Sequence, residues 1–231
     1  MGLLYHFFVY SVYPPICYTG YGFAHLDSFM NPIILKETGK VIDFTEQDLP
    51  MLIHGMSRAG ASLFSIAVIA NLFLSGKKVL FFTAYPMAKD EFTTQIQGTG
   101  KENDVFYLEN TSDIKRASDY EVIIVKSGDS GLCLQTIQML SDVQERIIFV
   151  KNIESILTRE LFDSVRKYQS IILSGDLDQI SFSSEITKIK FDTKILFSAT
   201  KVNIHADLPK LEKYTGFMTG NENGLVTLRI S

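Results

Sequence analysis

The stretch that decides the fold runs from residue 52 to residue 82 and reads "LIHGMSRAGASLFSIAVIANLFLSGKKVLFF". It opens with an apolar strand, passes through a loop that holds Gly55 and Gly60, and continues into residues 62–75, which are apolar nearly all round. A segment without a polar face predicts a helix buried between a sheet and its neighbours. Gly76 is a typical helix terminator, and an apolar strand follows it. The stretch therefore predicts a strand, a glycine loop, a buried helix and a second strand.

From Met30 onward, apolar β-branched runs alternate with helical segments. Such unbroken runs predict strands that are covered on both faces, as in a parallel sheet. The end of the chain, "YTGFMTGNENGLVTLRIS", predicts an antiparallel hairpin around an Asn/Gly turn. We therefore expect an α/β fold with a mainly parallel sheet and helices on both faces. The expected strands are 41–44, 51–55, 77–85, 104–108, 120–125, 146–150, 170–174 and 193–198, and two expected helices are 131–143 and 153–168.

The first 29 residues differ from the rest of the chain. They hold nine of its Phe and Tyr residues and no Lys or Arg, so the basic start of a signal peptide is missing. The Pro14–Pro15 pair interrupts the apolar run well before the roughly 20 residues that a membrane span needs. Two interpretations stay open: an aromatic extension that packs on the main domain, or sequence upstream of a start at Met30.

Composition narrows the function classes. The 231 residues are 46% hydrophobic, which is enough for one substantial core, and the formal charge is −4. An acidic chain without interleaved basic and aromatic residues does not indicate nucleic-acid binding. Cys17 and Cys133 lie far apart, and the histidines are scattered singly. We therefore expect no disulfide framework, no zinc site and a cytoplasmic location.

The glycine loop has the spacing of a phosphate-binding loop, G-x-x-x-x-G-K-[ST], between a strand and a helix. Glycines let backbone N–H groups converge on phosphate oxygens, and the helix start adds partial positive charge. The last residue of the loop offers a hydroxyl that would cap the helix or bind Mg²⁺. The expected nucleotide-binding residues are Gly55, Met56, Ser57, Arg58, Ala59, Gly60, Ala61 and Ser62.

The lysine of such a loop is replaced by Ala61. That lysine supplies a point charge to the β- and γ-phosphates, which matters for affinity and more for hydrolysis. Arg58 is the nearest cation, but side chains at its position tend to point away from the phosphates. Two interpretations remain: a phosphate cradle that has lost its main charge, or a tight turn between a strand and a helix.

With these elements in this order, the chain resembles the RecA-fold P-loop NTPases, and in particular the KaiC/RecA-type ATPases. The resemblance covers Val41 to Ser231 and rests on "GMSRAGAS", "SGKKVLFFTAYP", "ERIIFVKNIES", "SIILSGDLDQ" and "GLVTLRIS". It implies a RecA-like domain over residues 30–231, binding of ATP with Mg²⁺, and homo- or hetero-oligomers with RecA-fold paralogues. Both the Walker A loop and the Walker B strand depart from the family pattern.

The Walker B strand of the family ends in an aspartate that orients Mg²⁺, whereas "RIIFVKN" ends in Lys151 and Asn152. A cation here would oppose Mg²⁺ and would either meet a phosphate or reach solvent. The resemblance also implies a catalytic glutamate just after the second strand. Tyr85 and Pro86 stand there, so Glu91, expected on the next helix, is the remaining candidate.

The segment "LSGDLDQ" supplies the other polar candidates, Asp176, Asp178 and Gln179. It resembles the helicase motif in which a glutamine senses the γ-phosphate, so Asp176 and Gln179 are candidate catalytic residues. They would lie at the carboxyl edge of the sheet, where α/β proteins bind ligands. The alternative is a Gly-Asp turn in which Asp178 caps the following segment.

The leading hypothesis is a degenerate nucleotide-binding protein that is weak or inactive as an ATPase and acts as a regulatory or assembly subunit. One alternative is an active ATPase motor or DNA-processing enzyme, with Asp176 in the Mg²⁺–water role and Arg58 or Lys151 supplying the charge. The other is a structural α/β module that binds no ligand.

Overall fold

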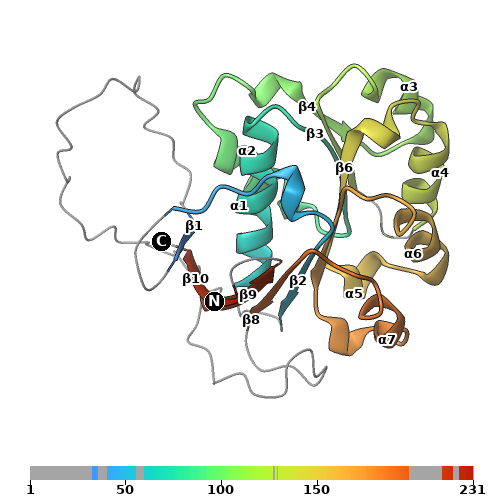
Figure 1. Ribbon diagram of the computed structural model, residues 1–231. Helices are drawn as coiled ribbons and strands as arrows, with labels where there is room; N and C mark the ends of the chain where they lie inside the picture. The colour runs from blue at the N-terminus through green and yellow to red at the C-terminus, as the bar shows by residue number, and fades with distance from the viewer. Residues whose placement is uncertain are drawn as a thin grey trace, which may run out of the picture.

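The computed structural model describes residues 33–35, 41–55, 60–126, 128, 130–197, 215–220 and 224–230. Its sheet has ten strands, and the helices lie on both sides of it (Figure 1). The strands are β1 Ile33–Leu35, β2 Met51–Gly55, β3 Lys78–Thr83, β4 Val105–Leu108, β5 Val122–Lys126, β6 Arg146–Lys151, β7 Ile171–Gly175, β8 Thr193–Phe197, β9 Thr215–Gly220 and β10 Gly224–Ile230. The helices are α1 Ala61–Leu74, α2 Met87–Ile96, α3 Ile114–Ala117, α4 Gly131–Met139, α5 Ile153–Ile156, α6 Arg159–Val165 and α7 Ser183–Ile186.

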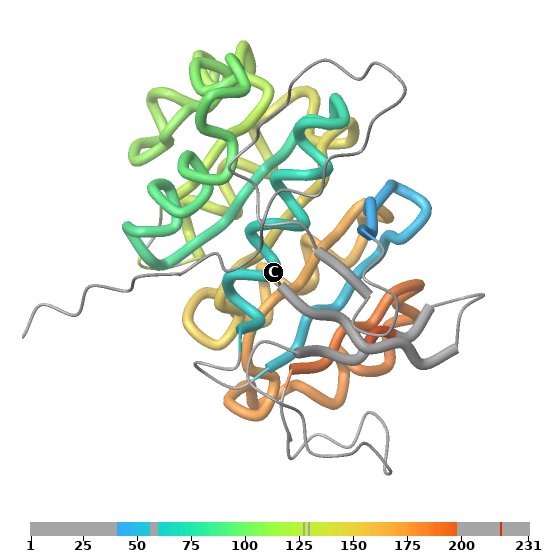
Figure 2. The backbone as a smooth tube through the Cα atoms, turned by 90° about the vertical axis from the view of Figure 1, so that its left-hand side faces the viewer, coloured from blue at the N-terminus to red at the C-terminus, as the bar shows by residue number. Residues whose placement is uncertain are grey.

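The sheet confirms the expected α/β class. Its order is β1-β10-β9-β8-β2-β7-β6-β3-β5-β4. Strands β8 through β4 in this order pair in parallel, while β9, β10 and β1 are antiparallel additions at the β8 edge. Figure 2 shows the blue segment of β2 beside the orange and red segments of β7 and β8, although these strands are distant in sequence. The expected C-terminal hairpin is formed by β9 and β10.

The sheet divides the interior into two apolar cores. One core joins alternate strand residues such as Ile53, Phe81 and Phe149 to α1 and α2. The other joins Leu52 and the remaining alternate residues to α3 through α7. Because side chains alternate along a strand, each buried strand contributes to both cores, which explains its continuous apolar sequence.

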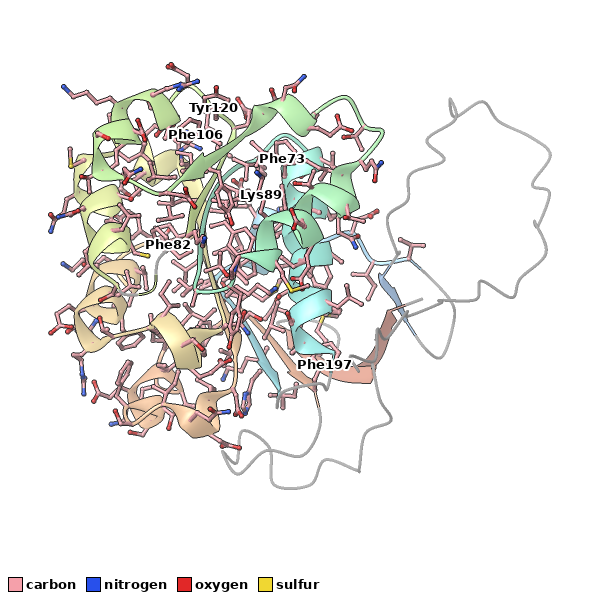
Figure 3. All side chains as sticks on the ribbon, turned by 180° about the vertical axis from the view of Figure 1, so that it is seen from behind. Phe73, Phe82, Lys89, Phe106, Tyr120 and Phe197 are labelled. Carbon is pink, nitrogen blue, oxygen red and sulfur yellow. The ribbon has the colours of Figure 1, made fainter. Side chains whose placement is uncertain are left out.

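Helix α1 is the central helix of the first core. It is buried on most of its circumference, and Phe64 near its start packs on Phe197 at the end of β8, with ring centroids 5.1 Å apart. Figure 3 shows Phe197 beside this end of the helix. At the other end, Gly76 has a φ of 93°, and its N–H bonds the carbonyl of Phe73. Gly76 therefore ends the helix as its sequence position predicts.

Two predicted elements differ in the structure. The strand expected at 41–44 is wrong: Val41 makes only an isolated bridge, because Thr45 and Asp48 form a capping box that turns the chain into a short 3-10 helix. The helix expected at 153–168 is divided into α5 and α6. The division occurs because the hydroxyl of Thr158 accepts the N–H of Leu161 and starts a new helix.

Several sequence-based expectations lie outside the described residues. They include the aromatic segment 1–29 and the loop residues 56–59. The boundary at Met30 therefore stays a prediction. None of the helices in the described ranges has the length and apolar character that a membrane crossing requires.

Candidate functional site

The candidate site lies at the carboxyl edge of the parallel strands. Strands β2, β7 and β6 are neighbours in the sheet, and their ends lie in register: His54 pairs with Gly175, and Ser174 pairs with Lys151. Helix α1 begins at Ala61, only six residues after β2 ends at Gly55. The edge therefore combines the start of a long buried helix with the polar ends of three strands.

The two loop glycines are both required by the backbone. A Cβ on Gly55 would lie 2.7 Å from the Cβ of Phe197 and 3.1 Å from the Cβ of Ala61, which leaves no room for a side chain. Gly60 has a φ of 109°, in the left-handed region that glycine adopts readily. Both a phosphate cradle and a simple turn need these glycines, so the glycines alone do not distinguish the two interpretations. Residues Met56, Ser57, Arg58 and Ala59 lie outside the described part of the chain.

The first helical residues occupy different environments. Ala61 is buried, whereas Ser62 is exposed. Ser62 is the second residue of α1, so it does not cap the helix, and Gly60 occupies the cap position instead. The exposed hydroxyl of Ser62 remains a candidate ligand for a phosphate or a cation at the helix start.

Three buried polar side chains line the sheet face beneath α1 and α2. Thr83 pairs with Lys151 across β3 and β6, and Lys151 pairs with Ser174 across β6 and β7. All three are buried. Phe149 belongs to the core on this face, and Lys151 lies two residues further, so its side chain projects to the same face. Lys151 therefore lies on the same side of the sheet as α1.

The side chain of Lys151 forms an ion pair with Glu91 of α2. Lys151 is buried, whereas the Glu91 side chain is 39% exposed, so the carboxylate stays partly hydrated. The structure thus brings together two residues that the sequence analysis considered separately. The pair places an ammonium group, balanced by the Glu91 carboxylate, where the pattern of the resembled family has a metal-orienting aspartate.

Asp176 and Gln179 form a closed turn after β7. One Asp176 carboxylate oxygen accepts the Asp178 N–H at 3.1 Å, and the other accepts the Gln179 amide at 2.8 Å. Asp176 is thus the cap of the short 3-10 helix Leu177–Gln179, rather than Asp178 as the turn alternative expected. Both candidate catalytic side chains have partners within this turn.

Two residues near this turn were not recognised in the sequence. His54, the residue before Gly55, is fully buried, and its Nδ1 lies 3.1 Å from the Gly175 carbonyl oxygen and 3.2 Å from the Leu177 nitrogen. Glu154 of α5 accepts the Asp176 N–H at 2.9 Å. The signal available for His54 is a polar residue inside an otherwise apolar strand. Glu154 carries no comparable signal, because its role depends on the packing of α5 against β7.

Burial lowers the pKa of His54, although the Gly175 carbonyl and the carboxylates of Asp178, Asp176 and Glu154 act in the opposite direction. The imidazole is therefore neutral at pH 7. Leu52 belongs to the core on the α3–α7 side, and His54 lies two residues further, so it projects to that side. His54 and Lys151 thus lie on opposite faces of the sheet.

A comparison of the sequence with models of known protein families finds no match, and a comparison with curated proteins finds none either. Solved structures do match the fold. The cytoplasmic domain of the type VII secretion ATPase EccC from Thermomonospora curvata has a TM-score of 0.57 at 10% identity over 87% of this chain. The genome packaging NTPase B204 from Sulfolobus turreted icosahedral virus 2, in complex with AMPPCP, has a TM-score of 0.52 at 11% identity over 79%.

The chain has the fold of the P-loop NTPases. A third structure, ATPases 2 and 3 of EssC from Geobacillus thermodenitrificans, matches with a TM-score of 0.50 at 11% identity over 88% of this chain. The alignment spans 26% of the EccC chain, 41% of the EssC chain and 97% of B204. At these identities the likeness concerns the fold, and the chemistry must be argued from the residues of this chain.

Proposed function

We propose that this protein binds ATP at the carboxyl edge of β2, β6 and β7, and that it hydrolyses ATP slowly or not at all. Its role is then that of a regulatory or assembly subunit. The fold supports this proposal, since P-loop NTPases hold phosphates at the start of the helix that follows the glycine loop. The B204 structure, solved with AMPPCP, is a nucleotide complex with the same fold.

The observation that carries the proposal is the position of Lys151. Its ammonium group is buried at the end of β6, on the face that also holds the start of α1. The Glu91 carboxylate already pairs with this ammonium, so we infer that a phosphate binds Lys151 by sharing it with that partly exposed carboxylate or by displacing the carboxylate. Strand β6 ends in Lys151 and not in a carboxylate that would orient Mg²⁺, so we infer that the site takes ATP without requiring the metal.

The replacement of the loop lysine by Ala61 supports weak or absent hydrolysis. Hydrolysis depends on cations that neutralise the charge developing on the γ-phosphate and on a metal that bridges the phosphates. Ala61 removes the first cation, and Lys151 occupies the place of the carboxylate that orients the second. Binding needs neither of them, since backbone N–H groups and the helix start still attract the phosphates.

Calorimetric titration tests the metal dependence. We expect ATP to bind as well without Mg²⁺ as with it, and ADP to bind more weakly than ATP if Lys151 contacts the γ-phosphate. A rise in ATP affinity of tenfold or more on adding Mg²⁺ would contradict the charge argument and favour an ATPase with a divergent metal site. Undetectable binding of both nucleotides would favour the structural module.

The substitution Lys151→Met tests the cation directly. It removes the ammonium but keeps much of the aliphatic chain, and Glu91 is exposed enough to remain hydrated. A contact between a charged group and a phosphate contributes about 1.5–3 kcal/mol, so ATP affinity should fall by about tenfold or more. The control is Lys77→Met, since Lys77 pairs with Glu46 and is 37% exposed. Equal affinities in the two variants would exclude Lys151 as a phosphate ligand.

The proposal includes oligomers with copies of this chain or with RecA-fold paralogues, because RecA-fold proteins place nucleotide between subunits. It also keeps the cytoplasmic location that the cysteine content suggests. Light scattering of the protein with and without ATP measures the assembly. A nucleotide-dependent rise in mass would support the subunit interpretation.

A further inference from the structure

A histidine and two aspartates lie together next to the candidate nucleotide site. One ring nitrogen of His54 and one carboxylate oxygen each of Asp176 and Asp178 are within 4.8 Å of one another. His54 and Asp176 are buried, whereas Asp178 is partly exposed and gives the cluster access to solvent. Metal ions bind oxygen and nitrogen ligands at about 2.0–2.2 Å, so the ligands of one ion lie within about 4.4 Å of one another, close to the separation in this cluster.

The hydrogen bonds of the imidazole are incomplete without a further ligand. Nδ1 lies within hydrogen-bond distance of both a carbonyl oxygen, that of Gly175, and an N–H donor, that of Leu177. A neutral ring satisfies only one of them, since Nδ1 either donates or accepts. The other nitrogen, Nε2, is buried and has no hydrogen-bond partner among the residues that the structure describes. A buried polar atom without a partner is costly and calls for an explanation.

We propose that His54, Asp176 and Asp178 bind a first-row divalent transition metal ion such as Zn²⁺. An ion bound by the ring nitrogen that faces the two carboxylates fixes the ring proton on the other nitrogen. Each oxygen of Asp176 keeps lone pairs beyond the hydrogen bonds to the Asp178 N–H and the Gln179 amide, so it can also accept a metal.

The ligand set selects the type of ion. Imidazole suits Zn²⁺ and similar transition metals, whereas Mg²⁺ prefers oxygen ligands and retains its water. Two carboxylates with one imidazole neutralise a divalent charge, and the Glu154 carboxylate next to the Asp176 N–H increases the negative potential. This ion is separate from nucleotide-bound Mg²⁺, because His54 and Lys151 lie on opposite faces of the sheet.

Zinc titration of the nucleotide-free full chain tests this site. After treatment with a chelator, we expect saturable binding of one Zn²⁺, detected by calorimetry, and no competition by Mg²⁺. Asp178→Asn should weaken this binding by at least about tenfold, since it removes the charge of one ligand. The matched control is Asp163→Asn, which changes the same groups at a position 44% exposed and paired with Arg166.

Cobalt provides a second measurement. Co²⁺ in place of Zn²⁺ should show visible absorption without a thiolate-to-metal band, because the ligands are nitrogen and oxygen, and Asp178→Asn should remove it. Absent Zn²⁺ binding in the unsubstituted protein, equal affinity in the Asp178→Asn and Asp163→Asn variants, or a thiolate band would each overturn the proposal. No nucleotide is present in these measurements, so a failure of the ATP proposal leaves their outcome unaffected.

Discussion

Ala61 and Lys151 together determine the charge of the candidate nucleotide site. Ala61 is buried at the start of α1, where it supplies no cation, and Lys151 is buried at the end of β6. If the loop is a phosphate cradle, a lysine at position 61 would reach the terminal phosphates, whereas Lys151 is already held by Glu91. The two positions are therefore the most informative ones for single substitutions.

The substitution Ala61→Lys restores the missing charge of the loop. If the loop is a phosphate cradle, ATP affinity should rise by about tenfold or more, because a charged contact contributes about 1.5–3 kcal/mol. ADP affinity should change little if the ammonium lies mainly on the γ-phosphate. Calorimetric titration of ATP and ADP into both proteins measures these changes.

Leu63→Lys is the control for Ala61→Lys. Leu63 is exposed on the same helical turn, so this substitution adds the same charge outside the loop. Gly60→Val should abolish binding of both nucleotides, because the φ of 109° does not suit a β-branched residue. If Ala61→Lys lowers stability without any gain in ATP affinity, the loop is only a turn.

At the scale of elements, the turn after β7 is held by close contacts with α5. Gly175 has a φ of 151°, and a Cβ there would lie 2.3 Å from Oε2 of Glu154 and 2.8 Å from the nitrogen of Ile153. Glu154 in turn accepts the N–H of Asp176. The position of α5 thus determines where Asp176 and the rest of the turn lie.

We expect Gly175→Ala to destabilise the protein by roughly 2 kcal/mol or more, from backbone strain and the displacement of Glu154. Gly128→Ala is the control, because a Cβ at Gly128 meets no atom of the described residues within 4 Å. Chemical denaturation of both variants gives the two free energies of unfolding. Equal free energies of unfolding in the two variants would show that α5 moves away from the new Cβ of residue 175 at little cost.

The start of β6 is held by a buried arginine. Arg146 donates to Asp142 through Nε at 3.1 Å and through a terminal nitrogen at 2.7 Å, and to the carbonyls of Glu121 and Tyr120 at 3.0 and 2.9 Å. Burial by itself would raise the pKa of Asp142, but the hydrogen bonds and charge of Arg146, helped by Lys78, outweigh it and lower the pKa. The two carbonyl hydrogen bonds thus connect the start of β6 to the segment before β5.

This ion pair predicts a pH-dependent loss of stability. Because folding lowers the pKa of Asp142, its contribution is present above the ordinary carboxyl value of 3.8 and is lost as the pH falls through the folded value. At pH 7, Asp142→Asn should lower the free energy of unfolding by about 2 kcal/mol. Near pH 3 the difference from the unsubstituted protein should shrink. Urea denaturation at both pH values measures it, and a difference that stays constant would contradict the assignment.

At the scale of the whole molecule, the seven parallel strands bring residues from distant segments to one edge. That edge carries a cation beneath α1 on one face and a histidine–aspartate cluster on the other. We infer slow hydrolysis because β6 ends in Lys151 and not in a carboxylate that orients the metal. This difference separates the regulatory subunit from the ATPase motor.

We therefore expect steady-state phosphate release from ATP to stay near the background rate. Hydrolysis would need the loop lysine, which Ala61 replaces, and a metal oriented by a carboxylate, whose place Lys151 occupies. A malachite-green assay with a Gly60→Val control measures the rate. Turnover near the median enzyme value, on the order of 10 s⁻¹, would exclude the inactive subunit and favour the motor.

The sequence by itself determined the succession of elements, because local patterns carry that information. The apolar runs of β3 and β6 predict buried parallel strands, and Gly76 predicts the end of α1. The spacing of Gly55 and Gly60 predicts a loop between strand and helix. The strand predicted at 41–44 is wrong because Thr45 and Asp48 form a capping box directly after it, and only Val41 of this segment makes a bridge in the described part of the chain.

Only the tertiary structure decided which side chains meet at the site. Lys151 and Glu91 are 60 positions apart, and His54 and Leu177 are 123 apart, so no local pattern connects them. Whether a side chain faces α1 or α5 depends on strand order and register, and a shift of one residue moves every side chain to the other face. The crossovers of the sheet bring the site residues together. The sequence therefore shows which polar residues are available, but it does not show which of them contact one another.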